Sequence, residues 1–429
     1  MSKRVAFLTL GCAKNEVDSQ AMQQELVRAG FDIVNIEDPA DAIVVNTCAF
    51  IQPAIEESLD AIFDIAQLEA VESGVCKLIV CGCMPSRFGS DLEAELTEAD
   101  KFVPCADEEH IVEVVSDALG LEPTPDSVTA AFSYQSSEYV KISDGCSRHC
   151  SFCTIPTIRG PYHSFSIDSI MSDVKEKVKG GAKEIVLIAQ DSGIWGLDLK
   201  PKMTLSDLLC ALASEFPATW FRVMYLQPAG LTDELVHTMA SYDNICSYLD
   251  IPLQHCDPEI LKSMNRKGSR EEYEAMVERL RLEVPGIALR TTLIVGYPGE
   301  TDEQFEELCD FVSTASFDYV GIFAYSPEDG TPAAALPNQV DEDTKQERLQ
   351  ILRDLADSVS SAQIAERIGS KADVLVLGTE EDGQLFGRTQ AQAPDVDGVT
   401  YVDSATIGEF ASTVIVDTLL YEMEAERVR

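Results

Sequence analysis

Strand-like and helix-like segments alternate from about residue 138 to residue 326, and this alternation constrains the fold more than any other feature. Amphipathic helices are expected between the strands, as at 166–181 and 205–216. Successive strand–helix units connect with a right-handed turn, so six of them curve into a partial or complete βα barrel. The active site of such a barrel lies at the C-terminal ends of its strands. The predicted strands are 138–143, 183–191, 220–226, 248–253, 287–299 and 319–326.

Two further domains are expected beside this core, which spans residues 136–365. Residues 1–119 also alternate strand and helix and predict an α/β domain with a parallel sheet. Residues 120–135 are rich in Pro, Ser and Thr and are typical of a linker. Residues 366–429 contain short strand-like runs with glycine turns, which predict a small all-β barrel of five or so strands, of the OB type in size. Its strands are expected at 372–378, 384–391, 400–405 and 411–422.

The composition restricts the location and the partners of the chain. No run of about 18 apolar residues is present, so we expect no membrane span and a cytoplasmic location. Thirteen cysteines without an export signal indicate reduced thiols and metal binding rather than disulfides. The formal net charge of −42 argues against non-specific binding to nucleic acid and favours a basic protein as partner. General acidity that serves solubility is the alternative explanation.

Cys146, Cys150 and Cys153 lie in the loop that follows the first predicted strand of the barrel. Four cysteines would close a 4Fe–4S cluster, whereas three leave one iron free to bind a substrate or cofactor. Phe152 is expected to pack against such a cluster and exclude water. Structural zinc, with His149 as a fourth ligand, is the main alternative.

A second set of three cysteines is expected in the N-terminal domain. Cys12, Cys48 and Cys83 each come just after the end of a predicted strand. Because parallel strands bring their C-terminal ends to one edge, these thiols should converge and again form three ligands. Cys81 lies within its strand, where it is expected to pack as a small apolar residue, so Cys83 is preferred. The rival cysteines of this domain are Cys76, Cys81 and Cys105.

The CxxxCxxC motif, with an aromatic residue before its last cysteine and at the start of a βα barrel, resembles the radical SAM superfamily. This resemblance implies that S-adenosylmethionine binds the open iron and is cleaved there to give a radical. The segment GGAKEIVLIAQD (180–191) implies that Glu184 and Gln190 hold the methionine end of the cofactor. The segment TLIVGYPGET (292–301) implies that the chain at Gly296 accommodates the adenine.

The segments LGCAKNEVDS, NTCAF and CGCM resemble the methylthiotransferases, and the resemblance covers essentially the whole chain. It implies an auxiliary 4Fe–4S cluster on Cys12, Cys48 and Cys83, and a C-terminal barrel of the TRAM type. It also implies insertion of sulfur and a methyl group at an unactivated C–H bond. Ala13 departs from the pattern, since family members often have proline there, but this should not change ligation.

Methylthiotransferases fall into two branches, which modify either a tRNA adenosine or the β-carbon of an aspartate in ribosomal protein uS12. The segment 251–266, with His255 and Cys256 where the tRNA branch has Ser-Gly, resembles the ribosomal-protein branch. The charge agrees, because residues 366–429 contain 13 acidic and 5 basic residues, whereas an RNA-binding barrel should be basic.

We therefore expect uS12, free or in the ribosome, as the partner, and flavodoxin or ferredoxin as the electron donor. The tRNA reaction is the main alternative. A non-catalytic electron carrier and a ribosome-binding scaffold are more remote ones.

Overall fold

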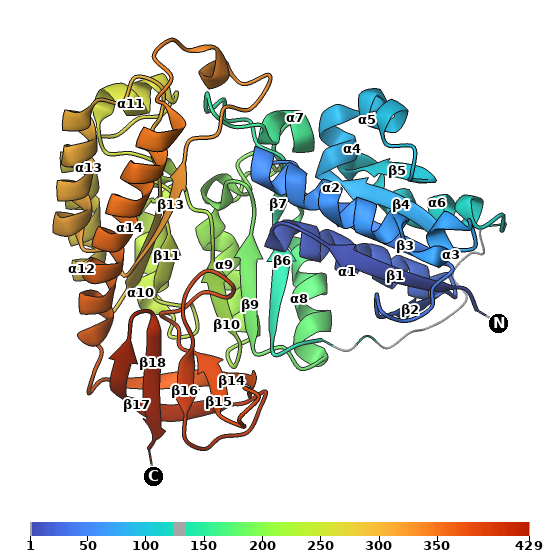
Figure 1. The fold of residues 1–429 in the computed structure, drawn as a ribbon. Helices are drawn as coiled ribbons and strands as arrows, with labels where there is room; N and C mark the ends of the chain where they lie inside the picture. Colours follow the sequence, from blue (N-terminus) through green and yellow to red (C-terminus); the bar gives the residue numbers. More distant parts are fainter. Residues whose placement is uncertain (1, 123–131, 133, 429) are drawn as a thin grey trace.

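The computed structural model describes residues 2–122, 132 and 134–428. Figure 1 shows an N-terminal domain beside a central barrel, with a small C-terminal barrel beneath the latter. Residues 123–131 and 133, in the segment predicted as a linker, lie outside the described residues.

The N-terminal domain is a parallel five-stranded sheet with strand order β2-β1-β3-β4-β5. Helices α1 (Ala13–Arg28) and α6 (Ile111–Ala118) cover one face, and α2 (Gln52–Ala66) packs on the other. The strands β3 and β4 lie in the middle and are almost continuously apolar, as expected for a sheet covered on both faces. The strands are β1 (Arg4–Thr9), β2 (Asp32–Val34), β3 (Ala42–Thr47), β4 (Lys77–Gly82) and β5 (Lys101–Pro104). The short helices are α3 (Glu69–Glu72), α4 (Cys83–Phe88), α5 (Ser90–Glu95) and η1 (Cys105–His110).

The central region confirms the predicted six-stranded partial barrel. Two parallel three-stranded sheets, β10-β9-β6 and β11-β12-β13, lie side by side. An isolated parallel bridge between Phe221 and Ile245 joins them. The strands are β6 (Ser137–Lys141), β9 (Glu184–Ile188), β10 (Trp220–Val223), β11 (Tyr248–Asp250), β12 (Ala288–Val295) and β13 (Tyr319–Ala324).

Helices surround the outside of this barrel and bury the main hydrophobic core against its strands. Several begin with a side-chain cap, and Thr204 and Thr301 each form a complete capping box with the residue three positions on. The main helices are α8 (Ile167–Lys179), α9 (Leu205–Glu215), α10 (Asp233–Ser241), α11 (Pro258–Ser263), α12 (Arg270–Glu283), α13 (Asp302–Ala315) and α14 (Glu342–Ala365). The short elements are β7 (Ser143–Asp144), α7 (Ile155–Arg159), β8 (His163–Ser164), η2 (Ser192–Ile194), η3 (Pro228–Gly230) and η4 (Pro332–Ala335).

The C-terminal domain is a closed five-stranded barrel with strand order β14-β15-β16-β18-β17, as predicted in type and size. One element differs, because segment 411–422, predicted as a single strand, contains most of one strand, a tight turn and the first residue of the next strand. Leu420 takes a φ of 54° in that turn, a conformation that the Leu-Leu-Tyr sequence gives no reason to expect. The strands are β14 (Lys371–Thr379), β15 (Leu385–Arg388), β16 (Thr400–Val402), β17 (Phe410–Leu419) and β18 (Glu422–Arg427).

The C-terminal barrel closes the lower end of the central barrel, where the central strands begin (Figure 1). Inward-facing residues of the central strands share one hydrophobic cluster with the C-terminal domain. Arg222 of β10 donates to the carbonyl oxygen of Gln390 at 2.8 Å, and Tyr248 of β11 donates to Asp397 at 2.7 Å. With the lower end closed in this way, the C-terminal ends of the central strands form the free end of the barrel.

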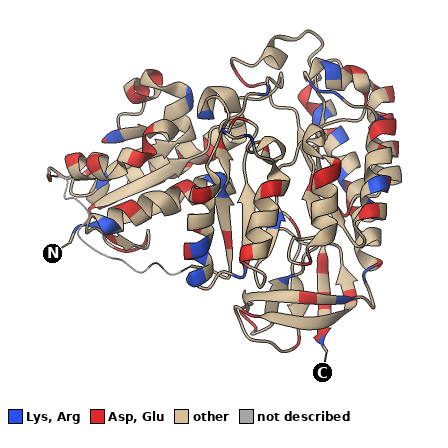
Figure 2. Ribbon diagram, turned by 180° about the vertical axis from the view of Figure 1, so that it is seen from behind, with Lys and Arg blue, Asp and Glu red and all other residues tan. Residues whose placement is uncertain are grey.

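Acidic residues are spread over the helices and over the C-terminal barrel (Figure 2). Among the described residues, no helix has the length and apolar character needed to cross a membrane.

Candidate active site

The loop with Cys146, Cys150 and Cys153 lies at the free end of the central barrel, after β6 and β7. Gly145 begins it with a φ of 72°, and a Cβ at this position would overlap the backbone of Pro161. The loop is fixed by backbone hydrogen bonds from Cys146 N to Gly160 O and from Cys153 N to Cys150 O, both 3.1 Å long. The three thiols are therefore held on one short, ordered segment.

Phe152 and Arg266 define the surroundings of this loop. Phe152 packs against a buried cluster that includes Met264 and Tyr297, so apolar groups shield one side. Arg266 donates to the carbonyl oxygen of Pro252 at 2.6 Å, and its Nη1 lies 3.9 Å from Cys150 Sγ. Burial raises the pKa of Cys153 to about 12, so the thiolate there needs a compensating positive group, as bound iron would be.

Cys12, Cys48 and Cys83 lie at the matching edge of the N-terminal sheet, where β1, β3 and β4 end. A Cβ on Gly11 would lie only 2.9 Å from Cys48 Sγ, so glycine lets the first strand end close to the second cysteine. Asn15 joins these strand ends, because its Nδ2 donates at 2.9 Å to the carbonyl oxygens of Leu10 and Thr47. Its Oδ1 lies 3.8 Å from Cys83 Sγ.

The other cysteines of this domain differ in position. Cys81 is completely buried inside β4, in the core beneath α1 and α6. Cys76 precedes β4 and lies at the opposite edge of the sheet. Cys105 follows β5 and lies beside Cys83, and their hydrogen bond together with burial raises the pKa of Cys105. Among the rival cysteines, Cys105 is thus the one that shares the site.

Arg159, at the end of α7, connects the two sets of cysteines. Its Nη2 donates to Asn15 Oδ1 at 2.7 Å and lies 4.0 Å from Cys83 Sγ. Its Nη1 donates to Asp18 at 2.6 Å. In the same region Thr154, next to Cys153, donates to the carbonyl oxygen of Phe50 at 3.0 Å. The loops of both sets therefore meet where α7 contacts the N-terminal domain (Figure 1).

From the sequence, Arg159 was expected only to extend the cysteine motif, since only the tertiary structure brings it to Asn15 and Cys83. In the part of the chain that the structure describes, no group of three His, Cys, Asp or Glu side chains is arranged to hold a metal ion. The fit to clusters rests instead on the placement of two cysteine triplets at adjoining strand ends, beside a buried guanidinium.

Gln190 lies at this end of the barrel, as predicted. It follows β9, and its Nε2 donates to Asp144 at 3.0 Å. Although burial opposes it, Lys141 and Arg159 hold the pKa of Asp144 at about 2, so this acceptor is a carboxylate. The Oε1 of Gln190 is buried and has no hydrogen-bond partner among the described residues. A bound ligand with a donor group, such as an ammonium, would satisfy this oxygen.

Glu184 does not join Gln190, and its predicted role needs correction. It is the first residue of β9 and therefore lies at the closed end of the barrel, one strand length from Gln190. Its carboxylate is 1% exposed and forms ion pairs with Arg222 at 2.9 Å and Arg388 at 2.7 Å. Glu184 therefore connects the central barrel to the C-terminal domain, and it is placed to stabilise that junction rather than to hold a cofactor.

Gly296 comes directly after β12, so it lies at the correct end of the barrel. It has a φ of 69°, and a Cβ there would overlap the side chain of Lys345 on α14. Its N–H donates to both carboxylate oxygens of Glu300 at 3.0 Å. The structure thus gives the packing of α14 as the reason for glycine here, and it shows no opening that this glycine creates.

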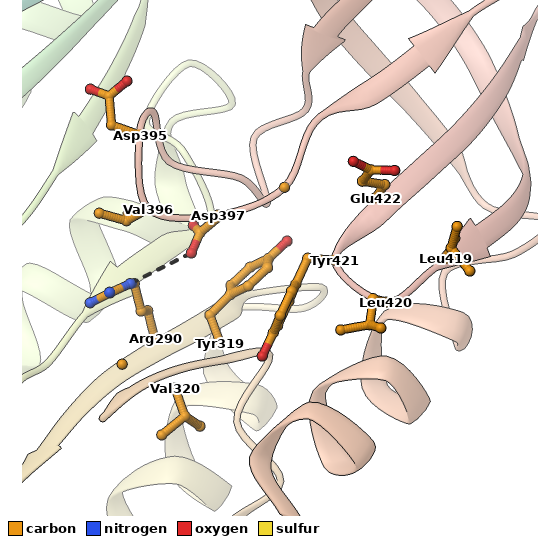
Figure 3. Close-up of a pocket in the computed structure, with 12 residues that line it drawn as sticks. Arg290, Tyr319, Val320, Asp395, Val396, Asp397, Leu419, Leu420, Tyr421 and Glu422 are labelled. Atoms are coloured by element: carbon orange, nitrogen blue, oxygen red, sulfur yellow. Dashed lines mark ion pairs between the residues drawn. The ribbon is translucent and has the colours of Figure 1, made fainter. Parts of the chain in front are cut away.

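Two cavities lie at the closed end of the barrel, and none of the six cysteines lines either. The first, of about 570 Å³, lies between β12, β13 and the C-terminal barrel. Figure 3 shows Arg290 and Asp397 facing each other in it, with their ion pair of 3.5 Å. The second, of about 930 Å³, lies between α1, β6 and the C-terminal barrel.

Comparison with known proteins agrees with this architecture. Residues 140–312 match the profile of the radical SAM superfamily, and residues 4–104 match the Uncharacterized protein family UPF0004. Residues 368–428 match the TRAM domain.

Solved structures share the fold at low sequence identity. The radical S-adenosylmethionine methyltransferase TsrM from Kitasatospora setae aligns with a TM-score of 0.56 and 15% identity, over 75% of this chain and 73% of that one. The cobalamin-dependent S-adenosylmethionine radical enzyme OxsB aligns with a TM-score of 0.51 and 13% identity, over 83% of this chain and 56% of that one.

Curated relatives are much more similar and extend over the whole chain. The ribosomal protein uS12 methylthiotransferase RimO of Geobacter sulfurreducens is 40% identical over 99% of this chain and 98% of its own length. The RimO proteins of Syntrophus aciditrophicus and Clostridioides difficile are 41% and 38% identical, over 93% and 98% of this chain and 91% and 98% of their own lengths. With its two cysteine triplets and TRAM domain, the chain belongs to the ribosomal protein uS12 methylthiotransferase family of radical SAM enzymes.

Proposed function

We propose that this chain transfers a methylthio group to the β-carbon of an aspartate of ribosomal protein uS12. The observation that carries the proposal is the meeting of two cysteine triplets at α7, where Arg159 and the bond from Thr154 to Phe50 join their loops. One triplet alone would suit S-adenosylmethionine cleavage or electron transfer, whereas two adjoining triplets suit a radical step coupled to sulfur insertion. The proposed cluster ligands are Cys146, Cys150, Cys153, Cys12, Cys48 and Cys83.

When bound, two 4Fe–4S clusters and S-adenosylmethionine supply the electron, the radical, the sulfur and the methyl group of this reaction. The protein residues orient these groups and keep the site dry. Phe152 and Tyr297 provide an apolar wall beside the Cys146–Cys153 loop. Gln190 offers an unpartnered oxygen to the amino group of S-adenosylmethionine. Asn15 and Arg159 hold the N-terminal strand ends against α7.

The choice of uS12 over tRNA rests on the relatives and on charge. All the similar curated relatives cited above are uS12 methylthiotransferases. Residues 366–429 contain 13 acidic and 5 basic residues, which disfavours phosphate binding and favours a Lys/Arg-rich protein. We place the reaction in the cytoplasm, on uS12 either free or in the ribosome, with a flavodoxin or ferredoxin as electron donor. The proposed domains are residues 1–119, 136–365 and 366–429, with residues 120–135 as the linker.

Mass spectrometry of uS12 tests the proposed reaction. Reconstituted protein, S-adenosylmethionine and a reductant should give uS12 with the added mass of a methylthio group on one aspartate. An anticodon stem-loop RNA in the same assay should stay unmodified. Modified RNA with unmodified uS12 would instead support the tRNA alternative. An electron carrier or scaffold would yield neither product and no 5′-deoxyadenosine.

Cysteine variants test the cluster assignment through iron content. Anaerobically reconstituted protein should bind about eight irons, in two clusters. Replacing all three cysteines of either triplet with alanine should leave about four. Loss of the 146–153 triplet should abolish 5′-deoxyadenosine formation, and loss of the N-terminal triplet should abolish only sulfur insertion. Cys81→Ser and Cys105→Ser serve as controls and should keep both clusters, so a loss of iron in either would transfer a ligand role to that residue.

A further inference from the structure

Lys14 is a buried lysine beside the N-terminal cysteines. It is the second residue of α1, two positions after Cys12, and it is 9% exposed. Its Nζ lies 3.4 Å from the centroid of the Tyr225 ring, a cation–π contact. Within the described residues, no carboxylate lies within 4.0 Å of this ammonium. A charge taken out of water in this way normally has an opposite charge beside it.

The other buried lysines show the usual arrangement. Lys177 also lies over a tyrosine ring, at 5.3 Å, but it is paired with Glu138 at 3.3 Å. Lys345 likewise lies 5.5 Å from a tyrosine ring and is paired with Glu342 at 3.3 Å. Lys14 shares their burial and aromatic contact and differs from both in having no counter-ion. An anion from outside the chain would therefore neutralise the positive charge of Lys14.

Tyr225 holds the lysine at the free end of the central barrel. It directly follows the end of β10 and has a φ of 60°, which is a strained value for a residue with a bulky side chain. Two bonds fix this backbone, from Tyr225 N to Asp250 at 3.1 Å and from Ser192 N to Tyr225 O at 3.2 Å. The protein thus retains a strained residue whose ring supports the Lys14 ammonium at this end of the barrel.

The other cations near the cysteines already have partners. Arg159 and Lys141 both pair with Asp18, and Arg148 pairs with Asp191. Arg266 has no carboxylate partner in the described part of the chain, but it donates to the carbonyl oxygen of Pro252 and contacts Cys150 of the other triplet. On the Cys12 side of the site, Lys14 is the described cation that remains available.

We propose that Lys14 binds the carboxylate of the target aspartate and so selects an acidic side chain for modification. This inference rests on the proposed function, in which the aspartate β-carbon accepts sulfur delivered at the Cys12 triplet. That carbon is bonded directly to the carboxylate carbon, so the group that holds the carboxylate must lie within a few ångströms of the delivered sulfur. Lys14 lies at the start of α1, two residues after Cys12, and the ring that holds its ammonium belongs to Tyr225, at the free end of the central barrel.

A double-mutant cycle tests the contact. Binding of uS12, and of uS12 with the target aspartate changed to asparagine, is measured on reconstituted enzyme with S-adenosylmethionine and no reductant. Wild-type enzyme should prefer the aspartate form by about 10- to 100-fold, as expected for a hydrogen bond to a charged group. Lys14→Met, which keeps an unbranched side chain over the tyrosine ring, should bind both forms about equally. Lys14→Arg should keep most of the preference.

Matched variants separate this role from a structural one. Lys177→Met removes a buried lysine over a tyrosine elsewhere and should lower stability while keeping the preference for aspartate. Lys14→Met should bind S-adenosylmethionine with unchanged affinity and keep both clusters by iron content. If its folding is impaired, Lys14→Gln, whose side chain is polar, uncharged and one bond shorter, replaces it in the cycle.

Three outcomes would overturn the proposal. In the first, wild-type enzyme modifies uS12, but Lys14→Met still prefers aspartate by tenfold or more. In the second, the variant loses S-adenosylmethionine affinity and the preference is unchanged, so that Lys14 serves the cofactor. In the third, wild-type enzyme leaves uS12 unmodified, and the proposed function then fails together with this contact. The first two outcomes leave the proposed function intact.

Discussion

Replacement of Glu184 by glutamine should destabilise the junction between the central barrel and the C-terminal domain. The glutamine keeps the shape of the side chain but removes its charge, which leaves Arg222 and Arg388 without the carboxylate that they share at 2.9 and 2.7 Å. Arg222 is fully buried, so water cannot replace the missing charge. Removing one partner of a buried ion pair costs about 3–5 kcal/mol, and this is the expected loss of unfolding free energy.

Trp220 provides a local measurement of this loss. Its ring lies 4.5 Å from that of Phe410 in the C-terminal barrel, so its fluorescence reports on the junction. The chain has two tryptophans, and Trp195→Phe makes Trp220 the single reporter. Urea unfolding of this background, with and without Glu184→Gln, should show the shift in midpoint. The affinity for S-adenosylmethionine should stay the same, since Glu184 lies at the closed end of the barrel.

The pH dependence gives the same prediction a second check. Although burial opposes it, Arg388 and Arg222 lower the pKa of Glu184 below the ordinary value of 4.5. A carboxylate with a lowered pKa in the folded state stabilises the protein above its ordinary pKa, and this stabilisation is lost as the pH falls through the folded value. The difference in unfolding free energy between the proteins with and without Glu184→Gln should therefore reach its full value at pH 7 and decrease below about pH 4.5.

Gln190→Leu is the matched control, with the opposite pattern. It should weaken S-adenosylmethionine binding and leave the Trp220 transition unchanged. The reasoning is refuted if Glu184→Gln changes stability by less than about 1 kcal/mol while weakening S-adenosylmethionine binding tenfold. That result would restore the role that the sequence motif suggested.

Further predictions concern the clusters, the substrate and pH. Arg159→Met removes a cation beside Cys83 and should lower the reduction potential of the auxiliary cluster by roughly 20–60 mV, the one-electron equivalent of one hydrogen bond. Arg266→Met removes a cation beside Cys150 and should lower the reduction potential of the other cluster instead. Spectroelectrochemistry of the two variants checks this, and equal shifts of both clusters in both would contradict it. Changing the exposed acids 380–382 to lysine should slow uS12 association about tenfold at low salt, with a smaller effect at high salt, measured by stopped flow. Burial raises the pKa of Asp397 from 3.8 to about 6, so this group should cost stability as pH rises through that range, and Asp397→Asn should flatten that part of the stability curve.

The fold was predictable because its signals are local. Hydrophobic runs and helix periodicity identify strands and helices one at a time, and the right-handed rule then places six units in a barrel. The position of the N-terminal cysteines was predictable for the same reason, since Cys12, Cys48 and Cys83 each follow a strand, and parallel strands end at one edge. The turn at Leu420 was not predicted, because no glycine or proline marks it in the sequence.

The remaining features depend on contacts between distant segments. Glu184 and Gln190 belong to one motif, but they lie at opposite ends of β9. Only the ion pair with Arg388 of the C-terminal domain shows that Glu184 belongs to the junction at the closed end of the barrel. Arg159 is adjacent to no N-terminal cysteine in sequence, yet the packing of α7 brings it to Cys83. In the same way, no pattern in the sequence shows that Lys14 lacks a counter-ion. This depends on the positions of all the described carboxylates around it, and these are set by the tertiary structure.

The shared hydrophobic cluster at the closed end of the barrel has a consequence for engineering. Val186, Ile188 and Met224 of the central strands pack on Val374, Val376 and Ala393 of the C-terminal domain, so each domain supplies part of the other's interior. A chimera that exchanges only residues 366–429 for the barrel of a relative with another substrate would bring a mismatched interior and lose the Arg388 ion pair. Swapping substrate preference between members of this family therefore requires the inward-facing residues of the central strands to be transplanted with the barrel, as one unit.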